Sequence, residues 1–489
     1  MIYIYLDGYE YNLGIFELIR SFFPNKELKN IEDLKEYSSG SLIYISIIEL
    51  NNFIVFRCQF FLDNELISKN EENLEKIFIE RNRDKAINIG VKKSIYRTLV
   101  EVSKTKHPWG VLTGIRPTKI VHELVEKNIN TNDIQNILIN QFLLDESKAN
   151  LIMEIAKRQE KYIYPISRLK YSLYINIPFC PTKCTYCSFP TVPIKNYYHL
   201  VDSYINQLIY EIKTIKELML LKEINTVYIG GGTPTSLPVK DLQMIIKEVY
   251  NCFGEDSIGE LTVEAGRPDT INLDMIKMFK EMNVNRISIN PQSMNDKTLK
   301  LIGRNHTSRD ILNSYEMAKY NGIETINMDL ILGLPGEGVK EINNTLKYME
   351  ELSPENITVH TLSLKNGSAL KDNMHKYNFE KQRIVENMLD AASAFADRNE
   401  YYPYYLYRQK NTIGNFENIG YSKKDKECIY NISIMEEKES IIGAGVGATT
   451  KIYYPDENRL ERTINFRSIN EYLNRFNEII SKKRNISLG

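Results

Sequence analysis

The chain has few of the residues that mark secreted or membrane-spanning proteins. It contains six cysteines in 489 residues, and three of them, Cys58, Cys252 and Cys428, are widely separated. Such scattered cysteines do not form the disulfide framework of small secreted domains. No apolar run approaches the roughly 18 residues that a membrane span requires. The first residues also lack the basic and apolar regions of a signal peptide. We therefore expect a cytoplasmic protein without a membrane span.

A strong excess of either charge is also absent. Lysine and arginine number 62, aspartate and glutamate number 63, and the formal net charge is −1. Proteins that bind nucleic acid through its phosphates usually concentrate positive charge. We therefore expect no nucleic-acid partner. The length is sufficient for two or three domains, each with its own core.

The remaining cysteines lie together in one short loop. Cys180, Cys184 and Cys187 follow the spacing C-x3-C-x2-C, after an apolar run, Leu173–Ile177, that predicts a buried strand. Three thiolates can bind three irons of a cubane cluster and leave the fourth iron open to another ligand. Zinc is the main alternative metal, although structural zinc takes four ligands and no obvious fourth ligand lies near in sequence. A disulfide is disfavoured because three cysteines cannot all pair.

From about residue 170 to 365, predicted strands and helices alternate. Strands are expected at Leu173–Ile177, Thr226–Ile229, Leu261–Glu264, Arg286–Asn290, Thr325–Leu332 and Ile357–Leu362. Helical patterns lie between them, and repeated βα units predict a parallel sheet with right-handed crossovers. The spacing alone leaves a partial barrel, a full barrel and a doubly wound sheet open.

Glycine or polar residues follow several of these strands at their C-terminal ends, where barrel enzymes assemble their sites. The second strand leads into GGGTPT, Gly230–Thr235, in which glycine lets the backbone approach a ligand closely. Glu264, Gln292 and Asp329 lie at or after the next strands. Arg304 follows Gln292, and an arginine can bind a carboxylate through two hydrogen bonds. Taken singly, each residue could equally be structural.

Taken together, these motifs resemble those of radical S-adenosylmethionine (SAM) enzymes. The string YINIPFCPTKCTYCSF is similar to the oxygen-independent coproporphyrinogen oxidase family of that superfamily. The resemblance implies an α/β fold, a partial (β/α)6 TIM-like barrel, with a [4Fe–4S] cluster on Cys180, Cys184 and Cys187 and with SAM on the open iron. It assigns SAM contacts to Tyr174, Tyr186, Gly231, Gly232, Thr233, Glu264, Gln292, Arg304 and Asp329. It implies no catalytic side chain beyond the cluster and SAM.

The resemblance also divides the chain. We expect an accessory α+β domain over 1–165, the radical SAM core over 166–365, and an α-rich region that covers the substrate over 366–489. The string at 107–124 and the tyrosine-rich stretch Tyr401–Ser422 resemble HemZ-type members of the family. That stretch is interpreted either as a polar surface hairpin or as a wall for a large flat substrate that carries carboxylates.

The family likeness implies a reaction. Its members convert propionates of coproporphyrinogen III to vinyls by oxidative decarboxylation, which gives protoporphyrinogen IX in anaerobic haem biosynthesis. A donor such as flavodoxin or ferredoxin would supply electrons, and a monomer is favoured. Phe189 stands where the well-studied branch has a fourth cysteine, and haem chaperones of the family share this ending. A haem chaperone and a radical SAM enzyme that acts on another tetrapyrrole are therefore the alternatives.

Overall fold

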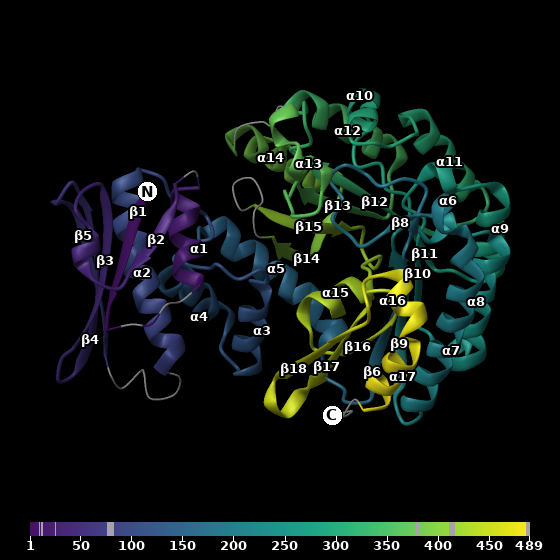
Figure 1. The fold of residues 1–489 in the computed structure, drawn as a ribbon, viewed down its shortest axis with the longest axis horizontal. Helices are drawn as coiled ribbons and strands as arrows, with labels where there is room; N and C mark the ends of the chain where they lie inside the picture. Colours follow the sequence, from purple (N-terminus) through teal and green to yellow (C-terminus); the bar gives the residue numbers. More distant parts are fainter. Residues whose placement is uncertain are drawn as a thin grey trace. The chain divides into compact units, whose positions relative to one another are not determined.

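The computed structural model describes the chain except for residues 9, 11–12, 25, 76–82, 378, 380–381, 410–415 and 486–489. The chain divides into two compact units, Met1–Ala156 and Lys157–Gly489, and the division falls inside helix α5 (Glu146–Ile163). Figure 1 shows the elements of both units. Among the helices described, none is long and apolar enough to cross a membrane.

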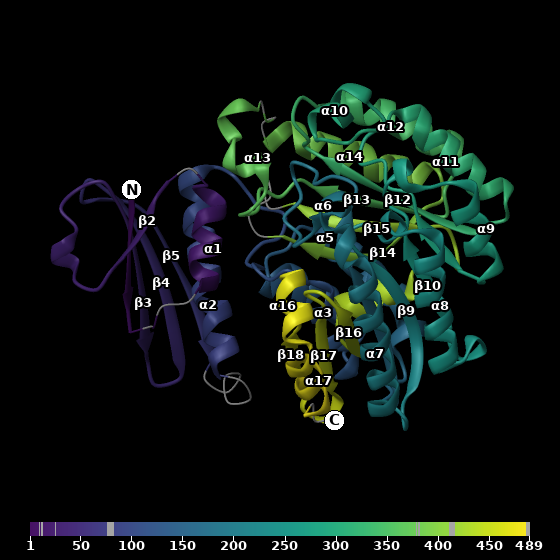
Figure 2. The ribbon, with the colours of Figure 1, turned by 45° about the vertical axis from the view of Figure 1, so that its right-hand side comes forward.

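The first unit is built on a sheet with the strand order β2-β1-β3-β4-β5. Its strands are β1 (Ile2–Asp7), β2 (Leu28–Ile31), β3 (Ser41–Glu49), β4 (Phe53–Leu62) and β5 (Glu65–Glu75). Helices α1 (Leu13–Phe22) and α2 (Arg83–Ser103) cover one face, as Figure 2 shows. Ile43 and Ile45, two residues apart on β3, are fully buried, as strand alternation requires.

The second unit is organised around six neighbouring parallel strands. They are β6 (Lys170–Ile177), β9 (Glu223–Gly231), β10 (Glu260–Glu264), β11 (Arg286–Ser288), β12 (Thr325–Leu332) and β13 (Asn356–Thr361). Each predicted core strand is therefore present, and the barrel-type α/β prediction is confirmed.

Five helices of this unit lie along the outer face of the parallel strands (Figure 1). They are α7 (Val201–Leu218), α8 (Val239–Phe253), α9 (Leu273–Glu281), α11 (Ser308–Tyr320) and α12 (Val339–Leu352). The strands are near-continuous apolar runs because helices or other side chains cover both of their faces. Val263 and Ile287, for example, are fully buried.

The region after residue 366 extends the sheet at both ends. Strands β14 (Tyr402–Arg408) and β15 (Glu417–Ser422) add antiparallel strands beside β13. Strand β16 (Ser440–Gly445) pairs with β6 in parallel, and β17 (Thr449–Tyr454) and β18 (Arg459–Ile464) follow it. The sheet in the described part of the unit therefore has eleven strands.

This region contains the expected helices together with strands that we did not predict. The helices are α14 (Gln382–Arg398), α15 (Ile429–Glu436), α16 (Ile469–Asn474) and α17 (Phe476–Arg484). Strand β16 was not predicted because half of its six residues are glycine or alanine, which are uncommon in strands. The stretch Tyr401–Ser422 does form a hairpin, but Tyr404 and Tyr405 are buried, so the surface interpretation is wrong. Residues 410–415 of the stretch lie outside the described part.

A buried polar cluster joins the last helices to the barrel. The Glu211 carboxylate on α7 is fully buried and accepts hydrogen bonds from the Gly445 N–H (2.9 Å) and the Tyr472 hydroxyl (2.7 Å). It also forms an ion pair of 3.2 Å with Lys483, which is 3% exposed. These partners compensate the cost of burying two charges, and they attach α16 and α17 to α7.

Candidate functional site

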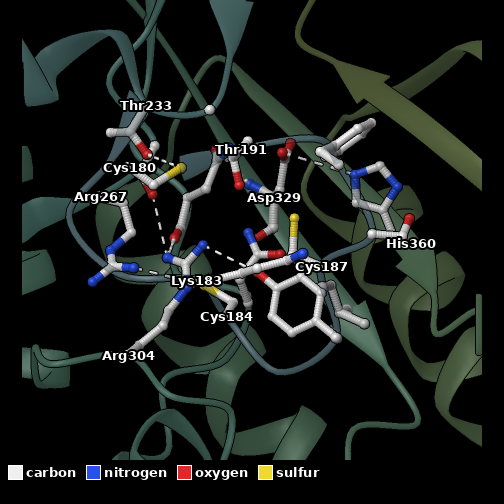
Figure 3. Close-up of a pocket in the computed structure, with 18 of the residues that line it drawn as sticks. Cys180, Lys183, Cys184, Cys187, Thr191, Thr233, Arg267, Arg304, Asp329 and His360 are labelled. Atoms are coloured by element: carbon white, nitrogen blue, oxygen red, sulfur yellow. Dashed lines mark hydrogen bonds and ion pairs between the residues drawn. The ribbon is translucent and has the colours of Figure 1, made fainter. Parts of the chain in front are cut away.

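A cavity of about 280 Å³ lies at the C-terminal ends of the parallel strands. The predicted residues that line it are Cys180, Cys184, Tyr186, Cys187, Gly231, Gly232, Thr233, Glu264, Gln292, Arg304 and Asp329. They come from five of the parallel strands or the loops that follow them, and the parallel fold brings these strand ends together. Figure 3 shows the labelled side chains around the cavity.

Tyr174 is the predicted residue that does not line this cavity. It lies on β6, and its hydroxyl donates to Asn176 Oδ1 at 3.0 Å. Its ring stacks with those of Tyr228 and Tyr430, with centroids 6.2 and 6.0 Å away. Its predicted contact with SAM remains a prediction.

The three cysteines border the cavity from one loop. The Cys187 N–H donates to the Cys184 carbonyl at 3.1 Å, which forms a tight turn between them. The Thr233 hydroxyl contacts Cys180 Sγ at 3.6 Å. Over the described residues, no three His, Cys, Asp or Glu side chains converge on one point as ligands of a single ion would. A cluster needs a different arrangement, because each thiolate binds its own iron, and three separate thiols around one cavity fit that requirement.

The glycines after β9 allow the backbone to pass close to this loop. Gly231 has φ +108°, and a Cβ there would lie 2.0 Å from Asn176 Oδ1. A Cβ at Gly232 would lie 2.9 Å from Cys180 Sγ. Only glycine is tolerated at such close approaches, so the GGGTPT turn can present its backbone to a ligand.

Glu264 is a buried carboxyl group at the end of β10. Its Oε1 accepts a hydrogen bond of 2.6 Å from the Tyr228 hydroxyl, and its Oε2 accepts one of 3.2 Å from the Gly231 N–H. Burial raises the pKa of Glu264 to about 7, and the nearby charge of Asp329 acts in the same direction. A bound cation would favour the ionised form, so the site is suited to an ammonium group.

Asp329 behaves differently although it is also buried. Burial opposes its ionisation, but the contacts with His360 and Asn327 outweigh this effect and lower the pKa of Asp329. Asn327 Nδ2 donates to Oδ1 at 2.7 Å, and His360 Nε2 lies 3.8 Å from Oδ2. The cavity therefore holds an ionised carboxylate beside a carboxyl group that titrates near neutrality.

Arg304 is held so that one of its N–H groups remains available. Its Nη1 donates to the carbonyls of Asn290 (2.6 Å) and Gly266 (3.2 Å), and its Nη2 donates to the Tyr186 hydroxyl (3.2 Å). Its buried Nε has no hydrogen-bond partner among the residues described. A buried donor without a partner is costly, so this nitrogen is suited to bind an anionic ligand group. Gln292 also adopts a left-handed backbone, φ +64°, beside Asp329.

Arg267 is a residue of the site that we did not predict. Its Nη1 lies 3.6 Å from Cys184 Sγ, and its Nε and Nη2 form a fork of 2.9 and 2.8 Å to Asp269. His306 Nδ1 contacts the same carboxylate at 3.3 Å. Figure 3 shows Arg267 beside the cysteine loop. Arg267 could have been predicted from the sequence, because it lies three residues after Glu264, at the end of the same strand.

Three further residues line the cavity, and two of them, His360 and Lys365, were not predicted. His360 and Lys365 lie at and after the end of β13, and Tyr407 lies on β14. His360 Nδ1 is 3.0 Å from the Tyr407 hydroxyl, so His360 joins that tyrosine to Asp329. Two residues of the tyrosine-rich stretch, Tyr407 and Gln409, therefore line the cavity.

Comparison with known proteins agrees with this architecture. The radical SAM superfamily matches residues 174–349. The oxygen-independent coproporphyrinogen-III oxidase-like protein HemZ of Bacillus subtilis is 43% identical over 382 residues, 77% of this chain and 76% of that protein. The heme chaperone HemW of Lactococcus lactis is 30% identical over 64% of this chain and 79% of its own length.

A solved structure shares the fold. The coproporphyrinogen III oxidase HemN of Escherichia coli, a radical SAM enzyme, superposes with a TM-score of 0.53 at 22% identity, over 66% of this chain and 73% of its own. Radical SAM proteins bind a [4Fe–4S] cluster and SAM, and these are the cofactors of this chain. The fold, the cysteine loop and the extent of the HemZ match lead to one assignment: the chain belongs to the radical SAM superfamily, in the family of oxygen-independent coproporphyrinogen-III oxidase-like proteins.

Proposed function

We propose that this chain catalyses the oxygen-independent oxidative decarboxylation of coproporphyrinogen III to protoporphyrinogen IX, in anaerobic haem biosynthesis. The observation that carries the proposal is that three cysteine thiols, two carboxyl groups and a buried arginine line one cavity at the strand ends. A relative that is 43% identical has a name that refers to coproporphyrinogen-III oxidase.

In this proposal, Cys180, Cys184 and Cys187 hold the cluster. When bound, the cluster and SAM supply a 5′-deoxyadenosyl radical by one-electron cleavage of SAM. Glu264 would accept hydrogen bonds from the ammonium group or the ribose of SAM. The Nε of Arg304, which has no partner among the described residues, would donate to the carboxylate of SAM. Asp329 is ionised and held by His360, so it can accept from ribose hydroxyls.

The remaining SAM contacts come from backbone and aromatic groups. Gly231, Gly232 and Thr233 present their backbone to the methionine end, and Tyr186 packs beside the cluster, where Arg304 holds its hydroxyl. Gln292 pairs with Leu330 on β12 through an isolated bridge, and Tyr174 is the member of the set that does not line the cavity. The role of these residues is to aim the reactive carbon and to exclude water.

The proposed reaction converts two propionate side chains of the substrate to vinyl groups. At each of two propionates, a hydrogen atom leaves with the deoxyadenosyl group, the carboxylate leaves as carbon dioxide, and one electron passes to a one-electron acceptor. A vinyl group remains. Reduction of the cluster requires a donor of the flavodoxin or ferredoxin class.

A second function, haem binding and transfer as a chaperone, has its own support. Phe189, two residues after Cys187, lines the cavity and is 62% exposed, and its side chain has no atom that could bind iron. A relative with 30% identity is named a heme chaperone. The first function is favoured because the match to HemZ is more extensive and includes more of this chain.

One anaerobic experiment separates these functions. The cluster of the full chain is reconstituted, SAM, dithionite and coproporphyrinogen III are added, and 5′-deoxyadenosine and the tetrapyrrole mass are followed. Loss of two carboxyl groups in step with deoxyadenosine supports the decarboxylase. Deoxyadenosine without change in the porphyrinogen indicates a radical enzyme on another tetrapyrrole. Tight haem binding without either product supports the chaperone.

A further inference from the structure

Lys365 is a cavity-lining cation without a carboxylate partner among the described residues. It follows β13 in the loop that leads to helix α13 (Ala369–Asp372), and it is partly buried. Across the described residues, its ammonium group has no carboxylate within ion-pair distance and no hydrogen-bond acceptor. Its electrostatic neighbour there is the Cys187 thiol on the cysteine loop. A partly buried charge without a partner loses hydration without compensation. This arrangement is expected where a ligand supplies the opposite charge.

The arginines and the histidine that line the cavity already have protein partners, whereas Lys183, which also lines it, is exposed on the cysteine loop. Arg267 is held by Asp269 through two hydrogen bonds, and Arg304 donates to two carbonyls and to Tyr186. His360 lies between Asp329 and Tyr407. The charge of Lys365 is not engaged in this way, so it is available to an incoming anion.

The residues that line the cavity with Lys365 are suited to a flat, partly apolar ligand. Leu362, Ile331 and the ring of Tyr407 line the same cavity. The Tyr407 hydroxyl is already bonded by His360 and by Gln409 Nε2, at 3.0 and 3.2 Å, which fixes the ring in place. Such a wall can pack against a pyrrole ring while the ammonium group binds an acid on its edge.

We propose that Lys365 binds a propionate carboxylate of the tetrapyrrole substrate and so orients one ring toward the cofactor side of the cavity. This inference rests on the proposed function and adds to it the residue that recognises the acid. Lys365 approaches from the β13 side, whereas the proposed SAM contacts Gly231 and Glu264 lie on the β9 and β10 side. When Lys365 binds the carboxylate of a propionate, the methylene groups of that propionate would therefore face the cavity.

The test measures binding rather than turnover. Coproporphyrin III, the planar oxidised form with the same four propionates, is titrated anaerobically into the reconstituted full chain, and fluorescence quenching reports its Kd. We expect Lys365→Met to weaken binding about tenfold, because a charged hydrogen bond is lost. Lys365→Arg should bind within a few-fold of the wild type. The uncharged tetramethyl ester should bind the wild type and Lys365→Met equally.

Lys371→Met is the matched control, since Lys371 lies on α13 and its ammonium donates to Asn366 Oδ1 at 2.6 Å. It should bind coproporphyrin III as the wild type does. Equal binding of the free acid by wild type and Lys365→Met would overturn the inference while leaving the proposed function intact. Loss of iron in Lys365→Met would also overturn it, because the lysine would then act on the cluster. A wild type that binds neither the acid nor the ester would overturn the proposed function and the inference together.

Discussion

The Tyr228 hydroxyl donates a hydrogen bond of 2.6 Å to Oε1 of Glu264. The bond connects the stack of Tyr174, Tyr228 and Tyr430 in the barrel to the floor of the cavity. It also orients the carboxyl group, because the other oxygen accepts from the Gly231 N–H. Both hydrogen-bond partners lie on β9, and Glu264 itself ends β10. These two strands therefore fix the carboxyl group before any ligand binds.

The stability of the cofactor-free protein should fall as the pH rises from about 4.5 to 7. The pKa of Glu264 is raised from 4.5 to about 7 in the folded chain, so folding favours the neutral acid. Its stabilising contribution is complete below the unfolded pKa and is lost as the pH rises through the folded pKa, with a total of at most about 3 kcal/mol.

Thermal unfolding at pH 5 and pH 8 measures this effect. The Glu264→Gln variant cannot titrate, so the difference between the two pH values should be smaller than in the wild type. Glu217→Gln, an exposed position on α7, should retain the wild-type difference. An identical pH dependence in Glu264→Gln and wild type would contradict the assignment.

Replacement of Cys184 by Ala should abolish the cluster absorbance near roughly 400 nm, because a thiolate ligand is lost. Iron and sulfide analysis after anaerobic reconstitution gives the second measurement. Cys252→Ala removes a thiol that does not line the cavity, and it should retain a full complement of iron and sulfide. A loaded Cys184→Ala variant would show that the ligand assignment is wrong.

Replacement of Arg267 by Met should make the cluster harder to reduce. The guanidinium group lies 3.6 Å from Cys184 Sγ, and a positive hydrogen-bond donor stabilises the more negative, reduced cluster. We expect about a tenfold lower ratio of reduced to oxidised cluster at a fixed potential, which for one electron is about 59 mV. An anaerobic redox titration followed by electron paramagnetic resonance measures the shift.

Two variants test whether this effect is electrostatic. Arg267→Lys keeps the charge but loses the fork to Asp269, so an intermediate potential is expected. Arg309→Met removes an exposed arginine near the start of α11 and should leave the potential unchanged. If Arg267→Met lowered only the melting temperature and kept the wild-type potential, Arg267 would be purely structural.

Replacement of Glu211 by Leu should destabilise the chain by about 3–5 kcal/mol, because it leaves the buried ammonium of Lys483 without its partner. Denaturant unfolding measures the loss. The double variant Glu211→Leu/Lys483→Met should recover much of it, since both buried charges are then removed. Full destabilisation in the double variant would show that the hydrogen bonds to Gly445 and Tyr472 matter more than the ion pair.

Much of the fold was predictable because its signals are local. The six parallel strands appear where apolar runs alternate with helical patterns, and the cysteines that border the cavity are adjacent in sequence. Strands β16 to β18 were not predicted, since these segments acquire their strand pairing from neighbours in the sheet.

The sequence by itself determined the βα repeat, the cysteine loop and the family, because periodicity and short motifs act within a few residues. Only the tertiary structure decided which side chains meet. Arg267 reaches Cys184 across 83 positions, His360 joins Tyr407 across 47, and Lys365 has no carboxylate partner within the described chain. Such contacts depend on the parallel sheet, which gathers distant strand ends at one rim. No spacing in the sequence encodes the distance between two side chains on different strands.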